Sequence, residues 1–515
     1  MARSVFEIIG PVMIGPSSSH TAGMARIGSM AFRILNMEPV DIHLDLSPKM
    51  RTTYSGHRSD AALFGGAMGY NESSDEIRNA IRIAHEKGIT TSVGFLPEGK
   101  YPQNTAKVVF TSENGEKHSV TGTSVGGGSI RILEVEDVHI ELEADLWNIV
   151  LWTMEELPAV YRTEDCRFQS GHTNNLTANC FVNAMSFIEK PAAEFIRELQ
   201  ELPGLIRFSL AEPVLVYGGT QPSYMSMSSC TEAIRLAKEQ GISLAEAAVR
   251  YEMKRSGKTH KEIVGLMQEQ LQVMKESVKK GQEENRLLYG LTSGHDGKML
   301  AKAVAEGRTI SQGIIPKAVS MAIGVMELNG SMGCIVAAPT AGSSGIVPGS
   351  VVAVQNTYHL TDEQMIDALF VSALMGVIMA EKGVSFSGSV GGCQGEIGVS
   401  SAITAAGLAS LFTDDPEAIC HAMALCMKNL LGLVCDPIAG PIEVPCIKRN
   451  AVGVANAFIS ADLALAGIRS YIPPDEVIDA LIDVEERLPG ELKCATIGGL
   501  ACTKTAVCTR HRLGQ

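Results

Sequence analysis

Aromatic residues and blocks of basic residues are both scarce in this sequence. Among 515 residues only 5% are aromatic and two are Trp, so the chain offers no row of rings on which nucleic-acid bases could stack. The 57 acidic residues outnumber the 43 basic ones, and the formal net charge of −14 disfavours a surface for nucleic acid. We therefore expect no nucleic-acid partner.

Long apolar runs are missing as well. The first residues, MARSVFEIIG, lack the apolar core of a signal peptide. The most apolar later stretch, 368–380, spans about 13 residues, whereas a membrane-crossing helix needs roughly 20, so this stretch predicts a buried helix. Twelve cysteines in a large chain without a leader indicate a reducing compartment. These features predict a cytoplasmic protein that has no membrane partner.

Three cysteines lie in sequence that is rich in Gly and Pro. Cys393, Cys435 and Cys446 occur in SVGGCQGEIG and GLVCDPIAGPIEVPCIKRN, where loops are favoured. Loops allow thiolates from separate segments to converge. Three converging thiolates suit an iron–sulfur cluster in which one iron has no protein ligand, and such an iron can bind a substrate as a Lewis acid. The other nine cysteines, among them Cys420 and Cys426 in an apolar helical stretch, are interpreted as core residues.

An N-terminal α+β domain is expected over 1–136. The run GPSSSHTAGMARIG places residues that favour helix N-caps ahead of an apolar-periodic stretch, namely Ser17, Ser18, Ser19 and Thr21. Free backbone N–H groups at a helix N-terminus, together with hydroxyls, can bind a carboxylate. Further along, VVFTSE and SIRILEV alternate like strands.

A second, smaller domain is expected over 138–214. Its elements are predicted in the order βαββαβ, with the first helix over 145–157, and this order resembles the ferredoxin-like ACT domain. A linker over 215–228 then precedes apolar helical sequence over 229–515. The expected fold class is α+β, with a large all-α C-terminal catalytic domain.

Five motifs together resemble those of the iron–sulfur-dependent L-serine dehydratases. They are GPSSSHTAGMARIG, TTYSGHRSD, AAPTAGSSGIVPG, GGCQGEIG and GLVCDPIAGPIEVPCIKRNAVGVANA. The resemblance covers nearly the whole chain, with a β-type portion over about 1–214 and an α-type portion over about 226–515 in one polypeptide. It implies a homodimeric lyase of amino-acid degradation and gluconeogenesis.

The resemblance also implies roles for particular residues. Cys393, Cys435 and Cys446 would hold a [4Fe–4S] cluster, and His20 and His57 would belong to the catalytic set. The substrate would be held by hydroxyl and carboxyl side chains, namely Ser17, Ser18, Ser19, Thr21, Asp60, Thr340 and Ser385.

The chemistry implied is the removal of water across Cα–Cβ of L-serine or a close β-hydroxy amino acid. Coordination of the β-hydroxyl to the open iron improves a poor leaving group. A neutral histidine, whose pKa is close to working pH, can take the Cα proton. The enamine formed would tautomerise and lose ammonia in water, which gives a 2-oxo acid.

The sequence departs from the family at three cations. Lys49, Arg51 and Arg58 stand where relatives carry small or neutral residues, and arginine can hold a carboxylate through two hydrogen bonds. A related [4Fe–4S] lyase or dehydratase that acts on a larger anionic hydroxy or amino acid is therefore an alternative. The other interpretation is that these cations form ordinary surface ion pairs.

A cysteine near the C-terminus is a further candidate ligand. Some relatives are thought to place a C-terminal cysteine on the open iron when substrate is absent. Cys494, Cys502 and Cys508 all lie in the last 22 residues, and Cys508 is the candidate because it is nearest the end.

Two other classes of protein remain as alternatives. A pyridoxal-phosphate enzyme would also deaminate serine, but it needs a Schiff-base lysine and a phosphate cup, and the sequence has no convincing pair of these. An amino-acid-sensing regulatory protein could be built on the ACT-like unit, but it would leave the loop cysteines and His20 unexplained.

Overall fold

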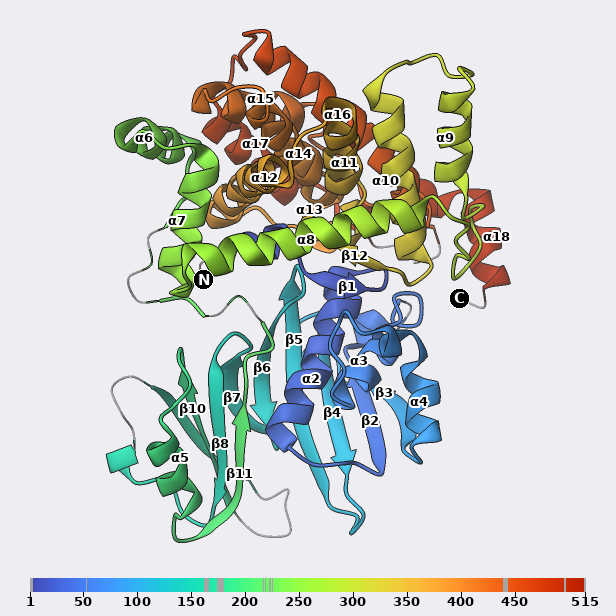
Figure 1. Cartoon of the computed structure of the whole chain (residues 1–515). Coiled ribbons are helices and arrows are strands. Elements are labelled where there is room, and N and C mark those ends of the chain that lie inside the picture. The colour runs from blue at the N-terminus through green and yellow to red at the C-terminus, as the bar shows by residue number, and fades with distance from the viewer. Residues whose placement is uncertain are drawn as a thin grey trace. The chain divides into compact units, whose positions relative to one another are not determined.

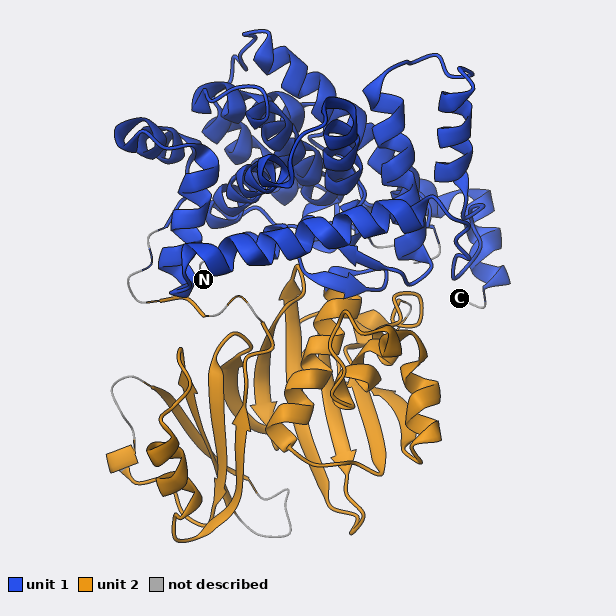
Figure 2. Ribbon diagram, viewed as in Figure 1, with its two compact units in different colours: residues 1–18, 222–515 blue, residues 19–221 orange. Residues whose placement is uncertain are grey.

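The computed structural model describes residues 3–51, 53–161, 166–173, 180–215, 217, 219–221, 224, 226–438, 443–494 and 497–513. Residues 162–165, where a strand was expected to pass, and residues 216, 218, 222, 223 and 225 of the expected linker lie outside these ranges. The chain divides into two compact units (Figure 2): unit 1 holds residues 1–18 and 222–515, and unit 2 holds residues 19–221.

The first 18 residues fold with the helical unit and not with the α+β unit that follows them in sequence. Strand β1 (Val12–Ile14) pairs antiparallel with β12 (Cys334–Val336), and the short helix α1 (Val5–Ile8) packs against α12 (Asp362–Lys382). The buried carboxylate of Glu252 accepts hydrogen bonds from Ser4 Oγ at 2.9 Å and from the backbone N–H of Val5 at 3.0 Å. The helical unit therefore contains one small sheet. The expectation that this part of the chain is purely α is wrong.

Unit 2 contains a six-stranded sheet in the order β3-β2-β4-β5-β6-β7, in which only β2 and β3 run parallel. The strands are β2 (Asp41–Leu46), β3 (Thr90–Phe95), β4 (Thr105–Thr111), β5 (Lys117–Gly126), β6 (Ser129–Val135) and β7 (Val138–Glu143). The helices of this part are α2 (Gly23–Leu35), α3 (Ser59–Ala67) and α4 (Ala80–Glu86), and α2 packs on the sheet at β5 (Figure 1).

Helices α2 and α3 touch backbone to backbone. A Cβ added at Gly28 would lie 2.3 Å from Leu63 O, and one added at Gly66 would lie 1.9 Å from Ala25 O. Only glycine permits so close an approach. This contact fixes the segment before α2, which carries His20, against the segment before α3, which carries His57.

The second sheet of unit 2 has the order β11-β8-β10-β9, with all neighbours antiparallel. Its elements are β8 (Trp147–Thr153), β9 (Arg167–Thr173), β10 (Cys180–Phe187), α5 (Ala193–Gln200) and β11 (Leu205–Ala211). The fold class α+β is confirmed. The strand order is also ferredoxin-like, because β8, the first strand of this sheet along the chain, lies between β10 and β11, the third and the fourth.

The helix expected over 145–157 is wrong, because this segment forms β8. All residues from 148 to 153 are buried in this central strand, and a continuous apolar run of this kind has the composition of a buried helix. The strand expected first, β7, instead completes the six-stranded sheet. Between β8 and β9 the described residues hold only the one-turn 3-10 helix Ala159–Tyr161.

The helices of unit 1 form a bundle around apolar helices at its centre (Figure 1). They are α6 (Cys230–Gln240), α7 (Leu244–Ser256), α8 (His260–Gly281), α9 (Asp296–Ala305), α10 (Ile314–Gly330), α11 (Ile346–Tyr358), α12, α13 (Gly388–Gly391), α14 (Val399–Ser410), α15 (Pro416–Lys428), α16 (Cys446–Leu465), α17 (Pro474–Arg487) and α18 (Lys504–Arg512). Among the described residues α12 alone is long and apolar enough to cross a membrane, and 78% of its apolar window is buried within the unit. The buried helix expected over 368–380 is confirmed.

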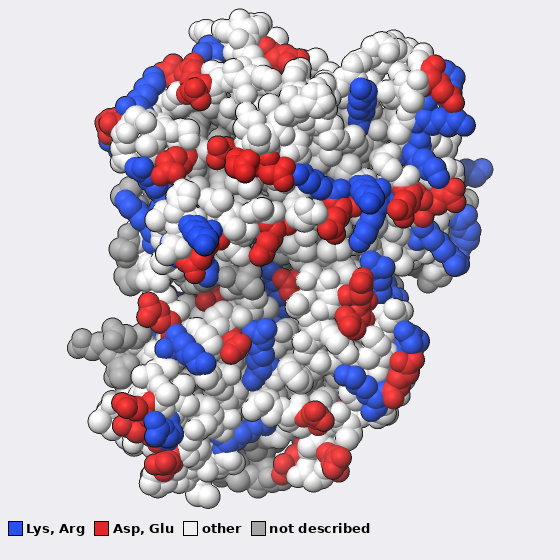
Figure 3. Space-filling model, in the orientation of Figure 1, with Lys and Arg blue, Asp and Glu red and all other residues white. Residues whose placement is uncertain are grey.

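On the face drawn in Figure 3, acidic and basic side chains are interspersed.

Candidate metal centre and histidine pair

The three motif cysteines are buried, and two of them lie at the starts of helical segments. Cys393 directly precedes the π-helix Gln394–Gly398, which continues into α14, and Cys446 is the first residue of α16. Cys435 lies in the loop between α15 and α16. The loop positions expected from sequence are therefore correct for Cys435, whereas the other two lie at helix N-termini, where backbone N–H groups favour a thiolate.

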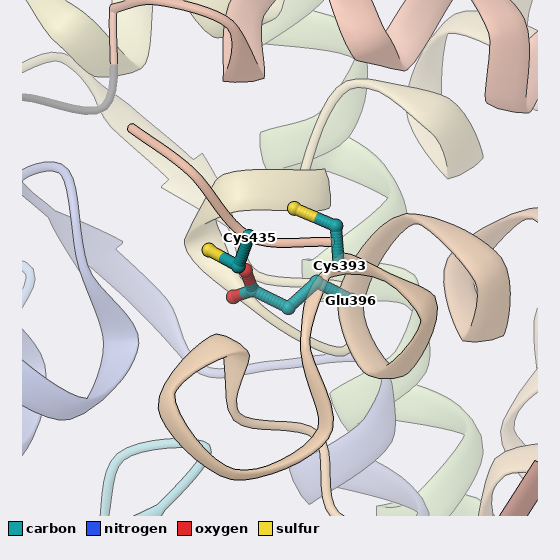
Figure 4. A group of neighbouring side chains, drawn as sticks. All are labelled: Cys393, Glu396 and Cys435. Atoms are coloured by element: carbon teal, nitrogen blue, oxygen red, sulfur yellow. The ribbon is translucent and has the colours of Figure 1, made fainter. Parts of the chain in front are cut away.

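Two of these cysteine side chains and one carboxylate converge, those of Cys393, Cys435 and Glu396 (Figure 4). The Sγ atoms of Cys393 and Cys435 and a carboxylate oxygen of Glu396 all lie within 4.8 Å of one another. Hydrogen bonds from the thiols of Cys393 and Cys494, together with burial, raise the pKa of Cys435 well above its ordinary value. Burial, and then the neighbouring Cys393, Glu396 and Cys494, also raise the pKa of Cys446. The structure thus brings Cys393 and Cys435 together, and Cys446 lies near enough to interact electrostatically with Cys393.

This donor set fits a metal centre that is rich in sulfur. Crowded thiols cannot all ionise in a buried pocket unless a cation compensates their charge, and the soft thiolate favours iron–sulfur clusters or zinc among biological metals. All twelve cysteines lie in the described part of the chain as free thiols, so no disulfide competes for these sulfurs.

Glu396 is a member of the site that the sequence interpretation missed. Burial raises the pKa of its carboxyl to about 7, against the opposing effects of a hydrogen bond from Thr340 and the charge of Arg449. Its position within GGCQGEIG, three residues after Cys393, was the available signal.

Arg449 was also missed, although it lies three residues after Cys446. Its guanidinium donates to Cys393 Sγ at 3.4 Å and to the carbonyl oxygen of Val434 at 2.7 Å. It also pairs with the buried Asp436 at 2.7 Å. The Arg449 side chain therefore connects the start of α16 to Cys393 and to the loop that carries Cys435.

Gly388 leaves the space that the side chains of Cys435 and Glu396 occupy. A Cβ at this position would lie 2.7 Å from Glu396 Oε2 and 2.9 Å from Cys435 Sγ. Real Cβ atoms do not approach so closely, so any other residue at position 388 would displace a sulfur or an oxygen of the group.

Two predicted substrate-binding residues lie beside this group. Thr340 is buried and hydrogen-bonds to Glu396, with Ser343 Oγ 3.2 Å from its hydroxyl. Ser385 is half-buried, and a Cβ at Gly395 would lie 2.4 Å from its carbonyl oxygen, so its backbone lies against the turn that carries Glu396.

Unit 2 contains the two predicted catalytic histidines as a stacked pair. Their ring centroids are 4.6 Å apart. Burial lowers the pKa of His57 to about 4, and burial together with the nearby His57 lowers the pKa of His20 to about 3. His57 Nδ1 lies 3.1 Å from the carbonyl oxygen of Thr53. A carbonyl can only accept, so Nδ1 carries the hydrogen and Nε2 carries the lone pair.

Helix capping was expected from the hydroxyl residues 17–21, but the structure does not show it. Ser18–Ala22 form a π-helical turn that continues directly into α2, whose first residues are not capped by a side chain. Thr21 Oγ1 donates to the carbonyl oxygen of His57 at 2.7 Å, so it fixes the histidine segment. Ser18 and Ser19 are buried and Ser17 is half-buried.

Asp60 and the three unusual cations differ in burial. Burial raises the pKa of Asp60, with Arg58 opposing the shift. Lys49 and Arg51 are exposed, and Arg51 stacks over the Phe95 ring at 4.5 Å. Arg58 is half-buried, adopts a left-handed backbone (φ 54°) and donates to the carbonyl oxygen of Arg78 at 3.1 Å, while its buried Nε has no partner in the described structure.

The expected tail cysteine, Cys508, is exposed on α18, whereas Cys494 contributes the thiol that hydrogen-bonds to Cys435. Cys494 was considered from sequence but placed behind Cys508, because distance from the C-terminus does not reveal how the tail folds back.

Comparison with known proteins shows which family this chain resembles. Residues 239–501 match the family model of the serine dehydratase alpha chain. A Bacillus subtilis protein named probable L-serine dehydratase, alpha chain, is 44% identical over 274 residues, which cover 53% of this chain and 91% of that protein. The corresponding beta chain of B. subtilis is 44% identical over 145 residues, which cover 28% of this chain and 64% of that protein.

A single-chain relative spans both regions. The L-serine dehydratase of Streptomyces coelicolor is 26% identical over 519 residues, which cover 97% of this chain and 99% of that protein. The family match and these relatives show that the chain belongs to the serine dehydratase family, with regions similar to separate alpha and beta chains joined in one polypeptide.

Proposed function

We propose that this chain is an iron–sulfur-dependent lyase that converts L-serine, or a close β-hydroxy amino acid, to a 2-oxo acid and ammonia. The observation that carries the proposal is the convergence of the buried Cys393 and Cys435 and the half-buried Glu396 in a member of the serine dehydratase family. Its relatives are named for L-serine dehydration.

Cys393, Cys435 and Cys446 would hold a [4Fe–4S] cluster. When bound, the cluster supplies a Lewis-acidic iron that improves the β-hydroxyl as a leaving group. Arg449 and Gly388 keep the sulfurs in place, the first through its bond to Cys393 and the second by leaving room for Cys435.

His57 is the candidate base for the Cα proton. Its lowered pKa keeps the ring neutral at working pH, and the Nδ1 bond to Thr53 leaves Nε2 ready to accept a proton. His20 stacks on this ring, and Thr21 fixes the backbone of His57, so both act to position the base. The enamine that leaves would tautomerise and release ammonia in water.

Hydroxyl groups would bind the charged ends of the amino acid. Thr340 and Ser385 in unit 1, with Ser17, Ser18, Ser19 and Asp60, remain the candidate contacts for the substrate carboxylate and amine. We further propose a cytoplasmic homodimer that acts on a small-molecule substrate in amino-acid degradation.

One observation favours a larger, anionic substrate as a second candidate. Arg58 presents a half-buried guanidinium whose Nε has no partner in the described structure. A second substrate carboxylate would satisfy such a group.

An anaerobic absorption spectrum with iron and sulfide analysis tests the proposal. We expect a broad shoulder near roughly 400 nm that air bleaches, about four irons per chain, and 2-oxo acid formation from L-serine. A sharp, reducible imine band would indicate pyridoxal phosphate instead. Protein without iron, sulfide or turnover would favour an amino-acid sensor.

A further inference from the structure

Four carboxylates of unit 1 are buried and bound to groups of the protein itself, namely Glu252, Glu327, Asp436 and Glu443. Two of them pair with arginines, at 2.6 Å to Arg255 and at 2.7 Å to Arg449. The other two each accept bonds from two backbone N–H groups, at 2.7 to 3.1 Å. These partners fix the four carboxylates, so none of them is available to a ligand.

The carboxylate of Glu396 differs from these four. It is half-buried, whereas every other residue from 391 to 400 is buried. Its hydrogen bond comes from the hydroxyl of Thr340, and the nearby guanidinium of Arg449 forms its ion pair elsewhere. A carboxylate can accept about four hydrogen bonds. Glu396 therefore has acceptor capacity left beside the two cysteine sulfurs (Figure 4).

Two glycines border this carboxylate. A Cβ at Gly342 would lie 3.5 Å from Oε1, and one at Gly388 would lie 2.7 Å from Oε2. Neither residue has a side chain that could cover the oxygens, so a small ligand can reach them. The hydroxyl of Thr340 donates to the carboxylate and holds it in this orientation.

A charged carboxylate that is partly removed from water is unfavourable unless a positive group compensates its charge. In the proposed reaction the substrate supplies such a group. Its ammonium lies on the carbon next to the one that carries the β-hydroxyl, so a substrate whose hydroxyl reaches the cysteine group brings the ammonium to the same place. Glu396 is the carboxylate found there.

We propose that Glu396 binds the α-ammonium group of the substrate and so selects amino acids over the corresponding hydroxy acids. The inference deepens the proposed function and rests on it for the class of substrate. Glu396 acts as a specificity residue, and removal of the Cα proton remains the task of His57. An ion pair that is formed equally in the ground state and the transition state lowers KM and leaves kcat nearly unchanged.

The substitution Glu396→Gln tests this, because it keeps the size of the side chain and removes its charge. Binding is measured by anaerobic titration calorimetry with L-alanine and L-lactate, which carry an ammonium and a hydroxyl on the same carbon and have no β-hydroxyl to eliminate. We expect the Kd for L-alanine to rise about ten- to a hundredfold and that for L-lactate by less than about twofold. For L-serine, KM should rise by a similar factor while kcat changes little.

The matched control is Glu485→Gln. Glu485 is another half-buried carboxylate of unit 1, and it accepts a hydrogen bond from the backbone N–H of Ser385 at 3.3 Å, which glutamine can also accept. This variant should leave the ratio of the two Kd values unchanged. Glu396→Asp, which keeps the charge, should retain part of the preference for L-alanine. Iron and sulfide are measured in every protein.

Three outcomes would overturn the inference. They are wild-type protein that binds L-lactate as well as L-alanine, an equal loss of both ligands in Glu396→Gln, and loss of iron from Glu396→Gln alone, which would make Glu396 part of the metal centre. Wild-type protein that holds no iron and does not turn over L-serine would overturn the proposed function instead. In that case a preference for L-alanine that depends on Glu396 would identify an amino-acid-binding protein without lyase activity.

Discussion

The rings of His20 and His57 stack with centroids 4.6 Å apart and planes inclined by 23°. Two imidazolium ions at this separation would repel each other strongly, so the pair is stable only when at most one ring is charged. Burial therefore keeps the proposed base His57 neutral, and the stack further lowers the pKa of His20.

The first prediction concerns pH and the stability of unit 2. The pKa of His57 is about 4 in the folded chain, against 6.5 as its ordinary value, so between these pH values the unfolded chain binds more protons. Unfolding free energy must then fall as pH decreases through this window and level off below it. The substitution His57→Gln should reduce the decrease in unfolding free energy between pH 7 and pH 5 by up to about 2 kcal/mol.

Tryptophan fluorescence in denaturant measures this effect in the relevant unit, because both Trp residues, Trp147 and Trp152, lie in β8. The matched control is His139→Gln, at an exposed position of β7. If His57→Gln and His139→Gln lose equal stability on acidification, the pKa of His57 is not lowered in the fold.

The second prediction concerns the metal. Cys393→Ala, Cys435→Ala or Cys446→Ala should each abolish iron retention, because a cluster with two remaining anchors falls apart. Iron and sulfide are measured in anaerobically purified protein. Cys420→Ala, at a buried thiol of α15, should retain wild-type iron content. Full iron retention in any of the three motif variants would rule out that residue as a ligand.

The third prediction concerns Gly388. In Gly388→Ala the new methyl group would lie within 3 Å of both Cys435 Sγ and Glu396 Oε2, so one of them must move. We expect iron content to fall at least about tenfold, while the unit stays folded. The control is Gly265→Ala in α8, where no atom lies within 4 Å of the added Cβ and where a gain of up to about 1 kcal/mol is expected. Normal iron binding by Gly388→Ala would show that the pocket adapts.

The three candidate cysteines could be singled out from the sequence because they lie in two short motifs that are rich in Gly and Pro. Glu396 and Arg449 lie in the same motifs, but their roles depend on side chains that come from distant segments. Cys494 depends on a backbone pairing between residues about 60 apart, and no local pattern encodes it. The positions of these residues at the site could therefore be found only from the folded structure.

Strand β8 shows the corresponding limit for the fold. The run from Asn148 to Thr153 is buried throughout, so neither the alternation of a half-buried strand nor the period of a helix is visible in it. Helix α5, which has an exposed face, and strand β6, in which buried and half-buried residues alternate over part of its length, were correctly predicted because their periodicity is retained.

The last prediction addresses substrate choice through Arg58. If its half-buried guanidinium faces the substrate, an amino acid with a second carboxylate should be processed better than L-serine. A charge-assisted hydrogen bond contributes about 1.5–3 kcal/mol, so Arg58→Gly should shift the ratio of the two kcat/KM values toward L-serine by roughly ten- to a hundredfold. Glycine also suits the left-handed backbone at this position, which limits any loss of stability.

The other two cations provide the controls, measured through anaerobic 2-oxo acid formation from both substrates. Lys49→Ala removes an exposed charge and should leave the ratio unchanged, since solvent screens such a group. Arg51→Ala removes a guanidinium that already stacks on Phe95, so any effect should appear in stability before specificity. Efficient turnover of L-serine that is indifferent to all three substitutions would place the cations outside the pocket and identify L-serine as the substrate.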